Sequence, residues 1–297
     1  MPIRYDIVHT TLYRYREPVA FGEHRVMFRP RDSHDLRVLA TDLRCSPEAQ
    51  IRMIQDPHSN SVALVTPLHP ADELKIVCTF TIEHAPGDGS ELELSPSALI
   101  FPFAYAVQER LDLEPYMRPL HDDPDGALMQ WARQFMRSGG PSGTRELLLK
   151  MNGFIRDHFA YAARDEEGTQ TPLQTLRSGS GSCRDFALLM IEAVRSLGMA
   201  ARFVTGYLYD PALDAAAPGN SLPTGAGSTH AWLQVYLPGA GWVPFDPTNN
   251  LRAGSSQLIR VGVARGPAQA APVSGSWFGP ADAYLGLSAS VQVRRVA

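Results

Sequence analysis

The stretch that most constrains the fold is residues 179–186, Gly-Ser-Gly-Ser-Cys-Arg-Asp-Phe, because it joins a flexible loop to a helix. From Phe186 to Leu197 the apolar residues recur at helical spacing, which predicts a helix with one buried face. Gly198 follows as the expected helix stop. The loop therefore delivers a single cysteine to the first turn of a buried helix.

Cys183 is the cysteine at this predicted helix start. Ser182 and Asp185 stand three positions apart, an acidic variant of the capping box, so Ser182 should be the N-cap. A helix N-terminus favours an anion, and thiols placed there can have a pKa of roughly 3.5 to 7.5. The alternative is a small buried core residue. A core cysteine needs no glycine-serine approach, so the loop favours a nucleophile.

The length and composition indicate a folded chain of one large or two ordinary domains and disfavour several classes of protein. The 297 residues are 44% hydrophobic, carry a net charge of −4 and contain no block of Lys and Arg. This disfavours disorder, nucleic-acid binding and attraction to an anionic membrane surface. The N-terminus lacks the apolar core of a signal peptide, and no run of about 18 apolar residues occurs. We expect a cytoplasmic protein.

The three cysteines, Cys45, Cys78 and Cys183, contain no CxxC pair, which argues against a disulfide framework and a structural zinc site. Residues 121–126 are acidic, but the ligand pattern of a calcium loop is incomplete, so they predict an acidic turn at a helix N-terminus. We expect no metal and no cofactor.

The hydrophobic pattern divides the chain into three parts. Residues 1–86 contain short alternating runs punctuated by turns, which predicts an N-terminal β-sandwich domain. Residues 87–125 are rich in proline and predict an irregular linker. Residues 126–297 predict an α+β catalytic core whose antiparallel sheet packs on the cysteine helix and which ends in further strands.

Within this third part, the pattern predicts helices and then strands. Helices are expected at 127–137 and 144–159, before the cysteine helix, and strands at 201–209, 231–237, 241–246, 257–263 and 287–294. Residues 211–228 are rich in Ala, Gly and Pro and predict a mobile surface loop that borders the active site.

His230 and Asp246 are the candidates for completing a site around Cys183. A catalytic thiol needs a base within hydrogen-bonding reach and a third group that orients the base. His230 opens one predicted strand and Asp246 ends the next. If the two strands form an antiparallel hairpin, these side chains meet. Each residue alone has an ordinary structural explanation, but the three together predict a Cys-His-Asp triad.

Three segments resemble the signatures of the bacterial transglutaminase-like superfamily: 181–187 (Gly-Ser-Cys-Arg-Asp-Phe-Ala), 229–232 (Thr-His-Ala-Trp) and 241–249 (Gly-Trp-Val-Pro-Phe-Asp-Pro-Thr-Asn). Residues 5–15 and the Arg-Pro-Arg at 29–31 resemble the β-rich N-terminal domain that accompanies this core. The resemblance implies a papain-like core with Cys183 as nucleophile, His230 as base and Asp246 as the orienting residue. Residues 264–267 depart from the expected Gly-Arg-Asp-Tyr.

This chemistry predicts an enzyme that acts on amide bonds through a thioester, with the backbone N–H of Cys183 helping to hold the oxyanion. Hydrolysis of a peptide, isopeptide or γ-glutamyl amide is the leading expectation. The alternatives are a transglutaminase, which transfers a glutaminyl group to an amine, and a binding protein that keeps the fold without turnover. Trp232, Trp242 and Tyr207 are expected substrate contacts, although the two tryptophans could equally pack in the core.

Overall fold

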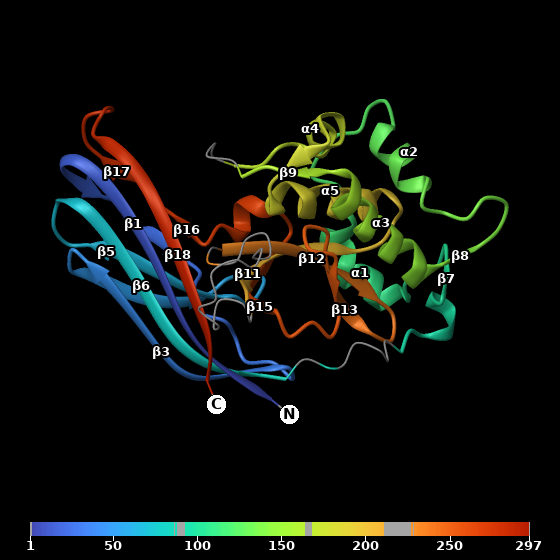
Figure 1. The fold of residues 1–297 in the computed structure, drawn as a ribbon, viewed down its shortest axis with the longest axis horizontal. Helices are drawn as coiled ribbons and strands as arrows, with labels where there is room; N and C mark the ends of the chain where they lie inside the picture. The colour runs from blue at the N-terminus through green and yellow to red at the C-terminus, as the bar shows by residue number, and fades with distance from the viewer. Residues whose placement is uncertain are drawn as a thin grey trace, which may run out of the picture.

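The first 84 residues, together with strands from the C-terminal end of the chain, form a sandwich of two antiparallel sheets, at the left of Figure 1. This computed structural model describes residues 2–85, 87, 93–163, 168–210, 227 and 229–296. The first sheet has the order β17-β1-β6-β3, and β18 pairs with β1. Its strands are β1 (Ile3–Phe21), β3 (Leu36–Ser46), β6 (Ala71–His84), β17 (Trp277–Phe278) and β18 (Tyr284–Val296).

The second sheet of the sandwich has the order β16-β2-β5-β4. Its strands are β2 (His24–Val26), β4 (Ala49–Gln55), β5 (Ser61–Pro67) and β16 (Val273–Ser274). Alternate residues such as Ile76 and Cys78 are buried because one face of each strand lies inward. Tyr5, at the end of the first sheet, is buried instead against the other half of the molecule, with its ring centroid 4.7 Å from that of Tyr209. The β-sandwich predicted for the first part of the chain is present.

The second half of the molecule is an antiparallel sheet covered by helices, at the right of Figure 1. The strand order is β14-β13-β12-β11-β15. The strands are β11 (Ala201–Leu208), β12 (Thr229–Leu237), β13 (Gly241–Asp246), β14 (Leu251–Arg252) and β15 (Leu258–Ala264). The helices are α1 (Val107–Met117), α2 (Ala127–Arg133), α3 (Thr144–His158), α4 (Pro172–Ser178) and α5 (Cys183–Ser196).

Helix α5 is the central helix of this half and packs against β12 and β11. The helix is present as predicted, but all residues from Phe186 to Val194 are buried, so it is enclosed on every side rather than on the one face that the apolar spacing predicts. Short elements complete the fold: β7 (Ile100–Phe101), β8 (Ser142–Gly143), β9 (Ala160–Tyr161), β10 (Ser180–Gly181), and the 3₁₀ turns η1 (Pro96–Ala98) and η2 (Pro267–Ala270). The architecture is α+β, with a papain-like core preceded by a β-sandwich.

Three details differ from the sequence expectations. The segment 87–125, expected to be irregular, contains helix α1. Helix α2 ends at Arg133, although the pattern predicts a helix to residue 137. Strands β16, β17 and β18 pair with strands of the N-terminal sandwich, although they follow the catalytic sheet in sequence. The last part of the chain therefore returns to the first.

The acidic turn predicted at 121–126 is present. The carboxylate of Asp123 accepts hydrogen bonds from the backbone N–H groups of Leu128 and Met129. It therefore satisfies two of the unpaired amides at the start of α2. Within the ranges described above, no group of three or more His, Cys, Asp and Glu side chains is arranged to hold a metal ion.

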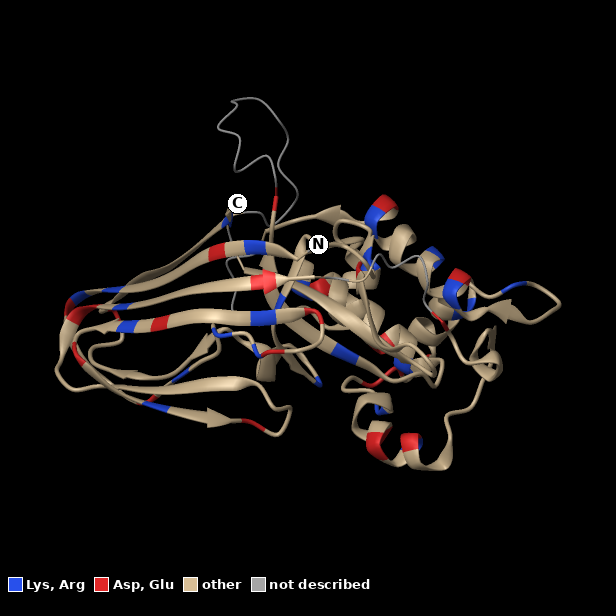
Figure 2. Cartoon of the chain, turned by 90° about the horizontal axis from the view of Figure 1, so that it is seen from below, with Lys and Arg blue, Asp and Glu red and all other residues tan. Residues whose placement is uncertain are grey.

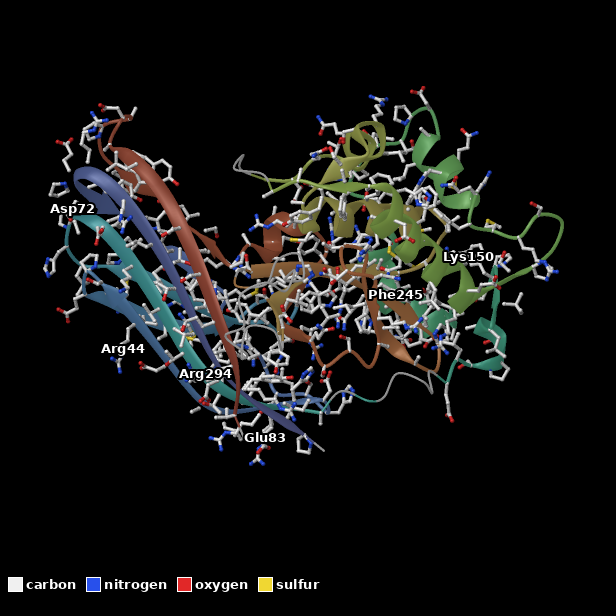
Figure 3. All side chains as sticks on the ribbon, viewed as in Figure 1. Arg44, Asp72, Glu83, Lys150, Phe245 and Arg294 are labelled. Carbon is white, nitrogen blue, oxygen red and sulfur yellow. The ribbon has the colours of Figure 1, made fainter. Side chains whose placement is uncertain are left out.

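The surface carries charges of both signs. Figure 2 shows Lys and Arg interspersed with Asp and Glu along the outer strands and the helices. In Figure 3 Phe245 lies among the densely packed side chains of the helix-covered half, whereas Arg44 extends outward from the sandwich. In the described residues, no helix is both long enough and apolar enough to span a bilayer. The cytoplasmic location stays a prediction.

Candidate active site

Cys183 is the first residue of α5, and Ser182 is its N-cap, as the sequence predicts. Asp185 holds this helix start in place. Its carboxylate accepts hydrogen bonds from the backbone N–H of Ser182 at 2.8 Å, from the Ser182 hydroxyl at 2.9 Å and from the backbone N–H of Gln170 at 2.7 Å. The thiol is thus presented from a helix N-terminus whose position is fixed by several bonds.

The glycine-serine approach to Cys183 is a short ribbon rather than a free loop. Strand β10 pairs in parallel with β9, so that Gly181 lies opposite Tyr161. A Cβ atom added at Gly181 would lie 2.8 Å from the Cβ of Asp185. Glycine is therefore required here because the chain passes directly over the side chain that caps α5.

His230 and Asp246 meet at the end of the hairpin formed by β12 and β13. The antiparallel register pairs Leu233 with Phe245, which brings the start of one strand beside the end of the other. His230 Nε2 lies 2.9 Å from Asp246 Oδ2, and both side chains are fully buried. His230 Nδ1 has no nitrogen or oxygen partner in the described part of the chain, so it is the ring nitrogen left to serve the thiol.

The Asp246 carboxylate is itself held by the turn that follows β13. Its Oδ1 accepts the backbone N–H of Thr248 at 3.0 Å, and its Oδ2 accepts the side-chain amide of Asn249 at 3.1 Å. Asn249 thus shares one carboxylate oxygen with His230. The sequence analysis assigned no role to Asn249. The Asp-Pro-Thr-Asn spacing could have indicated it, because an Asp side chain often accepts hydrogen bonds from the turn that follows it.

The electrostatics of the three residues favour a thiolate and an imidazolium. Burial lowers the pKa of His230, but the charge and hydrogen bond of Asp246, with those of Cys183, outweigh it and raise that pKa to about 10. Burial raises the pKa of Cys183, yet the hydrogen bond and charge of His230, the backbone N–H of Ala231 and the charge of Arg184 lower it overall. The site therefore stabilises both charges of the pair.

The three expected substrate contacts lie in different surroundings. Trp232 is 1% exposed, and its ring centroid is 6.0 Å from that of His230. Tyr207 is buried, and its hydroxyl is 2.8 Å from Nδ1 of His9 in the sandwich. Trp242 lies under the guanidinium of Arg202, 4.1 Å from it. Contact with a substrate stays a prediction for all three.

Tyr161 is a residue beside the thiol that sequence analysis missed. Its side chain is 42% exposed, and burial together with the proximity of Cys183 and Asp185 raises its pKa. The sequence holds no signal for this position, because it depends on the two-residue pairing of β9 with β10.

Two other segments complete the description of the site. The loop predicted at 211–228 lies outside the described residues, apart from Gly227. Residues 264–267 run from the last residue of β15 to the first residue of η2, and the Arg265 carbonyl accepts a hydrogen bond from the buried Arg195 of α5 at 2.6 Å. This segment thus ties the C-terminal end of α5 to the edge of the sheet.

Comparison with known proteins agrees with the resemblance noted in the sequence. The transglutaminase-like superfamily core matches residues 130–247, and the bacterial transglutaminase-like N-terminal region matches residues 5–83. An uncharacterized protein of Mycobacterium leprae is 25% identical over 294 residues, covering 99% of both chains. An uncharacterized protein of Mycobacterium tuberculosis strain H37Rv is 27% identical over 288 residues, covering 92% of this chain and 87% of its own.

A solved structure shares the whole architecture. The crystal structure of a protein from Cytophaga hutchinsonii, provisionally named a cysteine protease, superposes with a TM-score of 0.71 at 19% identity and covers 100% of this chain and 92% of its own. This likeness shows the common fold, sandwich included. With both family regions matched in their expected order, the chain belongs to the transglutaminase-like superfamily and carries the N-terminal region of its bacterial members.

Proposed function

We propose that the protein is a thiol-dependent enzyme that hydrolyses amide bonds of peptide, isopeptide or γ-glutamyl type. The observation that carries the proposal is the buried bond between His230 and Asp246, beside a cysteine whose pKa is lowered. Membership of the transglutaminase-like superfamily supports the same chemistry. Burying a histidine and a carboxylate costs desolvation free energy, which their mutual hydrogen bond only partly offsets. Buried pairs with shifted pKa values cluster at functional sites, which favours a catalytic role for this pair.

In the proposed first step, the Cys183 thiolate attacks the carbonyl carbon of the amide, and the carbonyl oxygen becomes an oxyanion. The backbone N–H of Cys183 is a donor for that oxygen, since it belongs to the unpaired amides at the start of α5. The carbon–nitrogen bond then breaks, and the proton on His230 passes to the leaving amine. An acyl thioester on Cys183 remains.

In the second step, the now neutral His230 takes a proton from the incoming nucleophile. Water gives the free acid and regenerates the thiolate, which is hydrolysis. A primary amine gives a new amide, which is transamidation. Asp246 keeps the imidazole in the orientation needed for both proton transfers and stabilises its charged form.

The test compares hydrolysis with acyl transfer on the same substrates. Glutamine-containing peptides and γ-glutamyl isopeptides are incubated with the protein, with and without excess cadaverine, and the products are weighed by mass spectrometry. We expect free acid as the main product in both conditions. A main product carrying cadaverine would instead establish a transglutaminase.

Two variants separate catalysis by Cys183 from other sources of turnover. Cys183→Ala should abolish product formation, whereas Cys78→Ala, which removes a buried thiol of the sandwich, should leave it unchanged. Turnover that survives Cys183→Ala would refute the proposed nucleophile. Saturable binding of these peptides without turnover by the unmodified protein would refute the enzyme and support the alternative, a binding protein.

A further inference from the structure

The β-sandwich contains a cavity that the proposed chemistry does not use. Its volume is about 320 Å³, at the lower end of the range for small-molecule pockets, about 300–1,000 Å³. The cavity lies between the inner faces of the two sheets, where strands β3 and β6 face strands β2, β4 and β5. Because β3 and β4 are edge strands, the gap between them opens to the surface.

Two sets of cross-strand neighbours form the walls of this cavity. Leu43 pairs with Cys78 on one sheet, and Ala63 pairs with both Val26 and Met53 on the other. Each set lies on one face because paired residues point to the same side of a sheet. The small side chains of Ala63 and Cys78 leave the space between the walls unfilled.

The mouth of the cavity is apolar as well. Met53 is 51% exposed and Ile51, on the same face of β4, is 38% exposed. Inner-face residues of a sandwich are normally covered by the opposite sheet. These side chains are exposed because neither edge strand has a neighbour to cover the gap.

Arg29 is the charged residue that lines the cavity. It belongs to the Arg-Pro-Arg segment, whose other arginine, Arg31, donates a hydrogen bond to the carbonyl of Ser59. Arg29 itself forms no hydrogen bond or ion pair with any of the residues that the structure describes. Burial raises the pKa of the Cys78 thiol to about 11, and the charge of Arg29 lies close enough to the floor of the cavity to act in the opposite direction.

Among the described residues that line the cavity, none is a carboxylate that could pair with Arg29. The nearby Asp42 alternates with the lining residues Thr41 and Leu43, so it lies on the opposite face of β3. There it pairs with Arg44, whose side chain extends away from the strand in Figure 3. The hydroxyl-bearing residues Thr41 and Ser61 also line the cavity, and the remaining lining residues other than Arg29 are apolar. A mostly apolar chamber with one unpaired guanidinium fits a ligand with an apolar body and an anionic end.

We propose that this cavity binds a medium-chain carboxylic acid, with its alkyl chain between the two sheets and its carboxylate on Arg29. The modest volume and the two flat walls suit one unbranched chain rather than a ring system. The guanidinium offers the forked donors that a carboxylate accepts. The site is independent of Cys183 and does not rest on the proposed hydrolysis.

Calorimetric titration of the full chain tests the proposal, with Cys183→Ala as the background so that no thiol chemistry contributes. Hexanoate, octanoate and decanoate should bind with affinities that rise about fourfold for each added CH₂ until the cavity is full. Arg29→Met should weaken decanoate binding at least about tenfold, the usual effect of losing a charge-assisted bond. Decanol has the same alkyl chain without a charge, so it should bind more weakly than decanoate. Its affinity should be the same for the Arg29→Met variant as for the background protein.

Two matched variants make the result specific to this cavity. Arg31→Met removes the neighbouring arginine, which does not line the cavity, and should leave decanoate binding unchanged. Ala63→Leu should fill the chamber and abolish binding, with circular dichroism showing that the fold persists. The proposal is overturned if decanoate shows no saturable binding, if Arg29→Met binds it normally, or if a short peptide with a free apolar C-terminus binds more tightly.

Discussion

Replacing Asp246 with asparagine should remove the negative charge beside His230 while leaving the geometry of the site almost unchanged. The substitution keeps the shape of the side chain and an oxygen that can accept the backbone N–H of Thr248. It removes the negative charge that lies 2.9 Å from His230 Nε2. Burial, the largest single influence on the His230 pKa, would then dominate and lower that pKa.

The size of the effect follows from the pKa of His230. Its rise from 6.5 to about 10 corresponds to about 5 kcal/mol of preference for the imidazolium over the neutral ring. Without the imidazolium, Cys183 loses the hydrogen bond and charge that lower its pKa. A thiol with an ordinary pKa near 8.5 is only about 1% ionised at pH 6.5. The more basic thiolate is more nucleophilic, which offsets part of the loss of thiolate. The net alkylation rate should therefore fall by roughly tenfold or more.

The assay is the second-order rate of iodoacetamide labelling at Cys183 between pH 5 and pH 9, read from the mass of the peptide that contains it. The wild-type thiol should react well below pH 8. In Asp246→Asn the pH at which the labelling rate reaches half its maximum should be higher than in the wild type. Cys45 and Cys78 contribute little, because burial raises the pKa of each to about 11. A folded Asp246→Asn protein with the wild-type rate at pH 6.5 would refute the electrostatic account of the site.

Three further predictions concern the supports around the site. Asn249→Ala removes one donor from the shared oxygen of Asp246, so it should lower turnover about tenfold and reduce labelling of Cys183 less than Asp246→Asn does. The pKa of buried His9 is lowered from 6.5 to about 4, so below pH 6.5 the unfolded chain binds a proton that the folded chain does not. Stability should therefore fall by about 3 kcal/mol between pH 7 and pH 4, and urea titrations of His9→Gln should show a shallower loss. A Cβ at Gly206 would lie 2.2 Å from the Ile259 carbonyl oxygen and 2.6 Å from the Trp232 ring, so Gly206→Ala should cost about 2–3 kcal/mol in urea unfolding. The matched change Gly140→Ala, where the added atom meets nothing within 4 Å, should stay within about 0.5 kcal/mol of the wild type; equal losses at both glycines would contradict the steric reasoning.

Local patterns were sufficient to predict the positions of the three candidate catalytic residues. The spacing of Ser182 and Asp185 places Cys183 at a helix start, and the structure has α5 begin at that residue. The change from helical to alternating period predicts a hairpin, and its antiparallel pairing brings His230 to Asp246. Both inferences concern segments that are close together in the sequence, so local sequence patterns are sufficient to make them.

What sequence reasoning missed depends on weak amphipathicity or on distant partners. Helix α1 contains Pro115 and buries only Leu113, so it lacks the apolar face that predicts a helix. The strand at the C-terminus is recognisable from its alternation, but alternation does not name the partner strand. The place of Tyr161 beside the thiol likewise depends on its pairing with Gly181, across a long intervening segment.

The pairing of β18 with β1 bears on how the protein forms during synthesis. The register runs from Arg4 opposite Val296 to Tyr15 opposite Tyr284, so these contacts join residues far apart in the sequence. A ribosome must make the catalytic half before the first strand gains its second neighbour. Until then one edge of β1 is open to association with other chains, and such high contact order slows folding. The nascent sandwich is therefore the part of this chain for which a holding chaperone would matter most.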